Sequence, residues 1–215
     1  MIKKLDNIRF GIEIEAEFPQ SKDSYDLIQR NRIIRGWKID EDGSLDNGAE
    51  YKPKDNNKLY FGEESLTQIK EIIALVKVHK GHIRTSCGLH IHIDAKEFTD
   101  TEIVNIVKKF IKNQSQIKKD FCVVKSRLKY NSRIIPKSVI KKINEDTIKK
   151  IRSGNEFDYS DDFYSNRNYM LNLQSLSTYG TLEFRFFNGT IMYNKIKGHI
   201  EWAINFCLNK KEKND

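Results

Sequence analysis

The chain has 215 residues, of which 38% are hydrophobic and 32% charged, and its formal net charge is +8. This composition excludes an intrinsically disordered chain, and the length allows a core that needs no disulfide or metal to fold. No apolar run is long enough to cross a bilayer and the N-terminal sequence lacks a secretory signal, so we expect one cytoplasmic domain over residues 1–215. The three cysteines form no CxxC pair, which predicts free thiols.

Strands and helices are predicted in an irregular order along the chain. The patterns indicate strands at residues 8–18, 37–40, 50–52, 82–94, 169–174 and 180–188, and helices at 64–80, 99–120, 138–151 and 195–208. Thr99 and Glu102 have the spacing of a capping box, which begins the second helix. This order favours an α+β class with a mostly antiparallel, curved sheet and helices on one face.

The positive charge is concentrated in one helical stretch at about residues 100–152. Residues 108–152, the basic segment, contain 15 Lys and Arg against three acidic residues, whereas residues 156–162 are acidic and predicted to form a loop. Apolar residues recur at helical spacing, so the lysines are expected to face outward. The charge then suits a solvated helical face, a funnel for phosphates, or a patch for an anionic macromolecule.

Three predicted strands carry an unusual set of polar side chains on one face. Because side chains alternate along a strand, these faces present the following residues: Glu13, Glu15 and Glu17; His90, His92 and Asp94; Thr181, Glu183, Arg185 and Phe187. One alternative is the ordinary solvated face of an antiparallel sheet. However, glutamate is depleted in strands, and gathered carboxylates repel one another unless a cation lies among them. Carboxylates with imidazole favour a Mg²⁺ or Mn²⁺ site.

Arg185 follows Glu183 by two residues and is predicted to share its face. A guanidinium beside a metal-binding carboxylate is suited to hold a phosphate or a carboxylate. The alternative is a structural ion pair with Glu183 or Glu15. The chain has neither a P-loop nor a dinucleotide-binding glycine motif, so metals and basic side chains would have to bind any nucleotide phosphates.

Several motifs occur in an order that resembles a known family. They are Phe10-Gly-Ile-Glu-Ile-Glu15, Trp37 with Asp42-Gly-Ser44 and Glu50, Cys87-Gly-Leu-His-Ile-His92, Tyr169-x-x-Asn172, and Thr181-Leu-Glu-Phe-Arg-Phe-Phe-Asn-Gly-Thr190. Together they resemble the amidoligases, small carboxylate–amine ligases of the glutamine synthetase and γ-glutamylcysteine synthetase superfamily, often encoded by phages or mobile elements. The resemblance implies a glutamine-synthetase-like catalytic fold, ATP, two Mg²⁺ or Mn²⁺ ions and an acyl-phosphate intermediate. If the chain is phage-encoded, the expected location is the host cytoplasm.

The resemblance also implies roles for individual residues. The implied metal ligands are Glu13, Glu15, Glu50, His90 and Glu183. His92, Glu183 and Arg185 are expected to act in catalysis, and His92, Arg185 and Asn172 to contact the nucleotide. Tyr169 would shape the same site, and Glu17 and Asp94 either contact an ammonium-bearing substrate or are solvated. Where the family usually has a small or hydroxyl residue before proline, this chain has Lys52 before Pro53.

A different class of protein also suits part of the sequence. The basic segment could follow a nucleic-acid backbone, and a carboxylate site with two metals also occurs in nucleases. We therefore keep a nucleic-acid-binding or nuclease-like hydrolytic protein as the alternative, and a catalytically silent family member as a third interpretation. The GLHxH and ExRF motifs favour the ligase, with a carboxylate and an amine as substrates and weak binding to nucleic acid or another acidic macromolecule as a further expectation.

Overall fold

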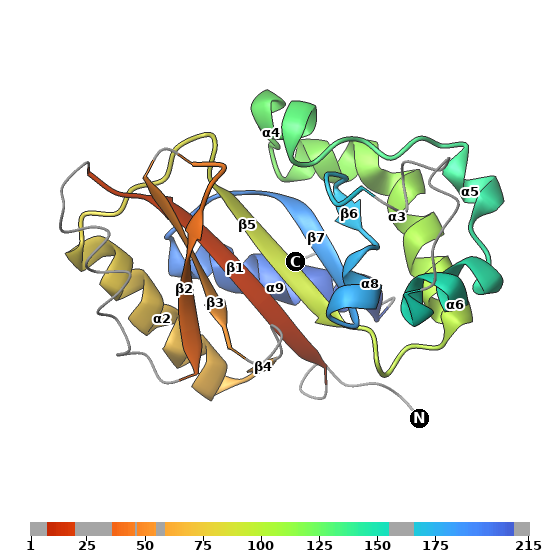
Figure 1. The fold of residues 1–215 in the computed structure, drawn as a ribbon, viewed down its shortest axis with the longest axis horizontal. Coiled ribbons are helices and arrows are strands. Elements are labelled where there is room, and N and C mark those ends of the chain that lie inside the picture. The colour runs from red at the N-terminus through yellow and green to blue at the C-terminus, as the bar shows by residue number, and fades with distance from the viewer. Residues whose placement is uncertain (1–7, 20–35, 46, 55–58, 155–165, 209–215) are drawn as a thin grey trace.

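The computed structural model describes residues 8–19, 36–45, 47–54, 59–154 and 166–208, so the predicted acidic loop at 156–162 lies outside the described residues. The described strands form one seven-stranded sheet in the order β2-β3-β1-β5-β7-β6, with β4 paired to β1 (Figure 1). All of these strand pairs are antiparallel. The strands are β1 (Arg9–Glu17), β2 (Trp37–Asp42), β3 (Gly48–Pro53), β4 (Leu59–Tyr60), β5 (Gly88–Asp94), β6 (Leu171–Asn172) and β7 (Thr181–Asn188).

Helices pack against the apolar face of this sheet, which confirms the α+β class. In Figure 1, α2 and α9 lie behind the sheet, and α3 to α6 lie together beside its β6 edge. The helices are α2 (Glu63–Val78), α3 (Asp100–Asp120), α4 (Lys125–Tyr130), α5 (Val139–Lys142), α6 (Glu145–Ser153), α8 (Ser175–Thr178) and α9 (Tyr193–Cys207). The predicted likeness to the glutamine synthetase fold stays a prediction.

Alternation along the central strands separates the core from the polar face. Phe10, Ile12 and Ile14 of β1 are fully buried, as are Leu89 and Ile91 of β5. Aromatic side chains of β7, α3 and α9 complete this core; the rings of Phe184, Phe186, Phe110, Trp202 and Phe206 lie in mutual contact. Because this face is sealed by helices, the polar side chains of the same strands are held at fixed positions on the other face.

A β-bulge in β7 corrects one predicted side-chain direction. Leu89 pairs with Phe187 and Ile91 with Phe184, so Arg185 and Phe186 together lie opposite the single residue His90. The extra residue returns Phe187 to the apolar side, where its ring stacks on His199 of α9 at a centroid distance of 4.6 Å. The prediction that Phe187 shares the polar face with Arg185 is therefore wrong.

Three predicted segments are clearly shortened or divided in the structure, whereas the ends of the others shift by one or two residues. The strand at 82–94 starts only at Gly88. The helix at 138–151 is divided into α5 and α6, because the Asn144 side chain accepts a hydrogen bond from the Thr147 amide and caps a new helix. The strand at 169–174 is reduced to β6, and the short helix α8 follows it. The capping box of Thr99 and Glu102 at the start of α3 is confirmed.

The basic segment folds into α3 to α6 with its apolar residues inward, as predicted. The buried residues of this segment include Phe110, Ile111, Ile143, Ile148 and Ile151. The exposed cationic side chains are Lys112, Lys119, Lys125, Lys129, Lys137, Lys141, Lys142, Lys149 and Lys150. The three cysteines are free thiols, as predicted. Across the described ranges, every helix is too short or too polar to cross a bilayer.

His199 is expected to make folding stability depend on pH. Burial and the neighbouring Lys195 lower the pKa of His199 to about 4. The unfolded chain therefore binds a proton between about pH 6.5 and pH 4 that the folded chain does not, so stability falls as the pH falls through this window. After allowance for partial solvent screening, we expect a loss of about 1–2 kcal/mol. Urea unfolding at pH 7 and pH 4.5 should show a smaller loss for His199→Leu; an equal loss in both proteins would contradict the prediction.

Candidate functional site

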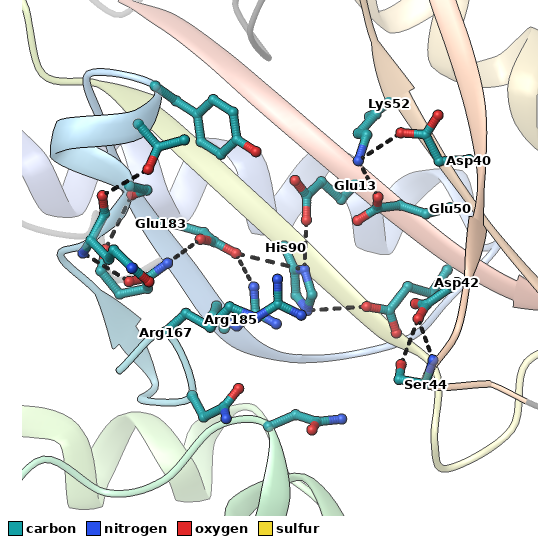
Figure 2. Close-up of a pocket in the computed structure, with 18 of the residues that line it drawn as sticks. Glu13, Asp40, Asp42, Ser44, Glu50, Lys52, His90, Arg167, Glu183 and Arg185 are labelled. Carbon is teal, nitrogen blue, oxygen red and sulfur yellow. Dashed lines mark hydrogen bonds and ion pairs between the residues drawn. The ribbon is translucent and has the colours of Figure 1, made fainter. Parts of the chain in front are cut away.

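A cleft of about 490 Å³ opens on the polar face of the sheet (Figure 2). The strand register explains why its residues converge, since directly paired residues point to the same side. Glu13 pairs with His90, Glu15 with Glu50, and Glu183 with His92. His92 is fully buried and does not itself line the cleft. The outer strands add further polar residues to this face. Asp40 of β2 pairs with Glu50, and Asn172 of β6 pairs with Glu183.

The first ligand group consists of Glu13, His92 and Glu183, whose metal-ligating atoms all lie within 4.8 Å of one another. His92 Nε2 lies 3.1 Å from Glu13 Oε1 and 3.9 Å from Glu183 Oε1, while its Nδ1 lies 2.9 Å from Thr181 Oγ1. Burial alone would raise the pKa of Glu13, but the two neighbouring histidines outweigh it and hold the pKa well below its usual range. A ring nitrogen directed at two carboxylates needs a proton or a cation between them.

The second ligand group consists of Glu13, Glu50 and His90. His90 Nδ1 lies 2.8 Å from Glu13 Oε2, so Glu13 belongs to both groups. Burial and the nearby Glu13 charge raise the pKa of Glu50 to about 8, although Lys52 opposes the shift. The Lys52 ammonium contacts Glu50 and lies 3.0 Å from Asp40 Oδ2, as Figure 2 shows. Lys52, the departure from the family pattern, therefore lies within the site.

Glu15 lies beside the ligand groups and belongs to neither. Its Oε2 accepts a hydrogen bond from the Gly88 amide, and its Oε1 lies 3.3 Å from His90 Nε2. Glu15 is almost fully buried, at 5% exposure. Its predicted role as a metal ligand stays a prediction, and in the structure it orients His90.

Arg185 and Asn172 hold the two oxygens of Glu183. Arg185 Nη1 contacts Oε1, and Asn172 Nδ2 donates a hydrogen bond of 2.6 Å to Oε2. Arg185 also lines the cleft, and its buried Nε has no hydrogen-bond partner within the described structure. The ion pair with Glu183 is confirmed, and the ligand-binding role of Arg185 stays a prediction.

Arg127 of α4 is a site residue that the sequence interpretation missed. It comes from the basic segment but is only 2% exposed. Its Nη2 donates to the Arg185 carbonyl at 2.7 Å and lies 3.2 Å from His90 Nε2. A side chain at position 88 would collide with this guanidinium, which accounts for Gly88 in the GLHxH motif. The prediction that the helices lie on one face of the sheet is therefore incomplete, because α4 supplies the Arg127 guanidinium to the polar face.

We expect Arg127→Met to lower the free energy of unfolding by about 2–4 kcal/mol, because the buried Arg185 carbonyl loses a charged donor. Urea unfolding measures this loss. The matched control is Lys125→Met on the same helix, where the side chain is exposed and a change within about 0.5 kcal/mol is expected. Equal stability of the two variants would show that Arg127 contributes no more than a surface lysine.

Three other predicted residues have structural partners and do not line the cleft. Glu17 accepts a hydrogen bond from Ser86 and pairs with Arg84, while Asp94 pairs with Arg9. Both carboxylates are buried, so the interpretation that they are solvated is wrong. Tyr169 packs beneath the Arg133 guanidinium at 4.7 Å from the ring centroid.

The Asp42-Gly-Ser44 motif lies at the acidic end of the cleft. Asp42 Oδ1 accepts hydrogen bonds from the amide and the hydroxyl of Ser44 at 2.8 and 2.6 Å. Asp40 and Glu41 precede this turn and also line the cleft, whereas Arg167 and Arg185 line it elsewhere. The motif thus fixes the turn that carries acidic side chains to one end of the cleft.

A cleft on the open face of the sheet, with a buried cluster of carboxylates and histidines, has the features of a candidate enzyme active site. A family model described as "Putative amidoligase enzyme" matches residues 7–207. The chain therefore belongs to this amidoligase family and is an enzyme of the ligase type. A search of curated proteins finds no match to the chain.

Proposed function

We propose that the protein is an ATP-dependent carboxylate–amine ligase that forms an amide bond through an acyl phosphate. The observation that supports this most is the position of Arg185, which lies in the cleft and contacts Glu183 of the first ligand group. A set of metal-ligating side chains in contact with a guanidinium is suited to a reaction in which charge develops on a transferred phosphoryl group.

The donor chemistry of the site fits Mg²⁺ or Mn²⁺. Carboxylate oxygens with imidazole suit these ions, and the described cleft lining contains no thiolate. Glu13, His92 and Glu183 would hold one ion. The second ligand group offers a position for the other of the two ions that the resemblance implies. A bound ion would neutralise phosphate charge during transfer.

The proposed reaction has two steps. A carboxylate oxygen of the substrate attacks the γ-phosphorus of ATP and displaces ADP, which leaves the carboxyl group as an acyl phosphate. The amine nitrogen then attacks the acyl carbon, phosphate leaves, and the nitrogen loses a proton to solvent. Arg185 would stabilise the transferring phosphoryl group, His92 and Asn172 would keep Glu183 and the phosphates in position, and the acidic end at Asp40, Glu41 and Asp42 would favour an ammonium-bearing amine.

The reaction can be tested before either substrate is known. The purified protein is incubated with ATP, Mg²⁺ and mixtures of carboxylates, with hydroxylamine or a panel of amines as the nucleophile. Release of ADP and phosphate that requires both a carboxylate and a nucleophile, with the amide or hydroxamate detected by mass spectrometry, would support the ligase. Metal-dependent nicking of DNA without ATP, and no ATP turnover with a cell extract as substrate source, would favour the nuclease-like alternative.

The basic segment is expected to give weak, sequence-independent binding to DNA or RNA. Its exposed lysines would neutralise phosphates and release counterions, so binding should weaken steeply with salt. The measurement is a titration of labelled duplex and single strand at low and physiological salt. The test variant changes Lys141, Lys142, Lys149 and Lys150 to Glu. The matched control changes Lys70, Lys77, Lys195 and Lys197 of α2 and α9 to Glu. Equal binding by both variants would leave the segment as a solvated face.

A further inference from the structure

Lys52 of β3 lies among the carboxylates at one end of the cleft. Its ammonium contacts Glu50 and lies 3.0 Å from Asp40 Oδ2, and its side chain is only 15% exposed. Figure 2 shows the ammonium directed at both carboxylates. The aliphatic part of the side chain is therefore covered, and the charge is fixed at Glu50.

The members of the second ligand group already have cationic partners from the chain itself. Lys52 contacts Glu50 Oε2, and Arg127 Nη2 lies 3.2 Å from His90 Nε2. A divalent ion bound by Glu13, Glu50 and His90 would lie close to the Lys52 ammonium, and two positive charges repel strongly where little water screens them. To admit such an ion, Lys52 would have to leave Glu50.

The first ligand group offers a better position for an ion. Lys52 is the one lysine among the cleft-lining residues of the described ranges, and its ammonium pairs with Glu50 and Asp40. Its charge reaches the first ligand group only at Glu13, which both groups share. Arg185 contacts Glu183 Oε1 much as Lys52 contacts Glu50, but its charge is delocalised over a planar guanidinium, whereas the charge of Lys52 is concentrated on one ammonium. His92 Nε2 faces Glu13 and Glu183, while Thr181 can accept a hydrogen bond from Nδ1–H and so leave Nε2 as a ligand.

We propose that the Lys52 ammonium takes the place of one divalent ion, so that the protein binds a single Mg²⁺ or Mn²⁺ at the first ligand group. This inference rests on the proposed function for the existence of a metal site and differs from the two ions that the resemblance implies. The positive charge at Glu50 is then part of the chain.

The stoichiometry of Mn²⁺ binding tests the proposal without an activity assay. Free Mn²⁺ is followed by electron paramagnetic resonance during titration of the protein with Mn²⁺ alone, and calorimetry gives an independent count. We expect one equivalent for the unmodified protein. Lys52→Ser and Lys52→Met should each bind a second equivalent, at least about tenfold more tightly than any second binding to the unmodified protein.

The control is Lys38→Ser, which removes another ammonium from Asp40. Lys38 Nζ lies 3.3 Å from Asp40 Oδ2, but the side chain is 46% exposed and contacts no ligand group in the described structure, so this variant should still bind one equivalent. Lys52→Met keeps most of the covered aliphatic stem, and circular dichroism shows whether each variant is folded.

Each outcome of the titration decides between the proposals. Two equivalents in the unmodified protein, or one equivalent in both folded Lys52 variants, would overturn the role of Lys52 while leaving the proposed ligase activity intact. No Mn²⁺ bound by any of these proteins would overturn this inference together with the metal-dependent mechanism. One equivalent rising to two in the Lys52 variants alone would support it.

Discussion

Glu13→Gln is expected to abolish divalent-ion binding and to lower amide formation by about 10²–10³-fold or more. Glu13 is shared by both ligand groups, since Oε1 lies 3.1 Å from His92 and Oε2 lies 2.8 Å from His90. Glutamine has nearly the same shape but replaces a charged oxygen with an amide nitrogen, which donates hydrogen bonds and does not bind a metal ion. Mn²⁺ titration and product detection by mass spectrometry measure the two losses.

Glu17→Gln is the matched control for this experiment. Glu17 follows on the same strand and on the same face, but it pairs with Ser86 and Arg84 and does not line the cleft. We expect this variant to bind Mn²⁺ and to form product as the unmodified protein does. Any small change in its stability is measured separately. Normal metal binding by Glu13→Gln, or an equal loss in both variants, would contradict the assignment of Glu13.

Arg185→Lys is expected to lower kcat by about 10²-fold or more while KM changes little and the fold persists. Lysine retains a positive charge that can pair with Glu183, but it lacks the planar guanidinium that binds two phosphate oxygens at once. The loss would therefore occur in the transition state rather than in substrate binding. Steady-state kinetics with the amine and carboxylate found by the product screen give kcat and KM separately.

Arg133→Lys provides the comparison for Arg185→Lys. Arg133 is a partly buried arginine whose guanidinium stacks on Tyr169, and it does not line the cleft. We expect near-normal kcat for this variant. Near-normal turnover by Arg185→Lys as well would show that Arg185 serves only as an ion-pair partner of Glu183.

Strand periodicity predicted most of the site, because the relevant residues lie on regular strands. The polar faces of β1 and β5 follow from simple alternation, and their antiparallel pairing brings Glu13 opposite His90. The placement of Glu50 required the register between β1 and β3, which the motif order implied and alternation alone did not. The site could therefore be predicted wherever two residues share a strand face, and with less detail where the pairing of distant strands decides the contact.

Two of the features that were missed, Arg127 and the bulge in β7, depend on tertiary contacts with no local signal. Arg127 lies in a run of cations that has the composition of a solvated helix, and only the space left by Gly88 admits it to the interior. In the sequence, Phe186 and Phe187 are two ordinary aromatic residues, and nothing near them indicates the bulge in β7. Asn144 could have been recognised as a helix cap, since its spacing to Thr147 is local.

The bulge in β7 also reduces the entropy that the enzyme would lose when a substrate binds. Arg185 lies in the bulge, between Phe184 and Phe187, and both of these rings are fully buried in the core. Arg127 and Ser132 both donate hydrogen bonds to the Arg185 carbonyl, at 2.7 and 2.6 Å. The backbone that carries the guanidinium is thus preorganised during folding, so little conformational freedom at Arg185 remains to be removed when a ligand arrives.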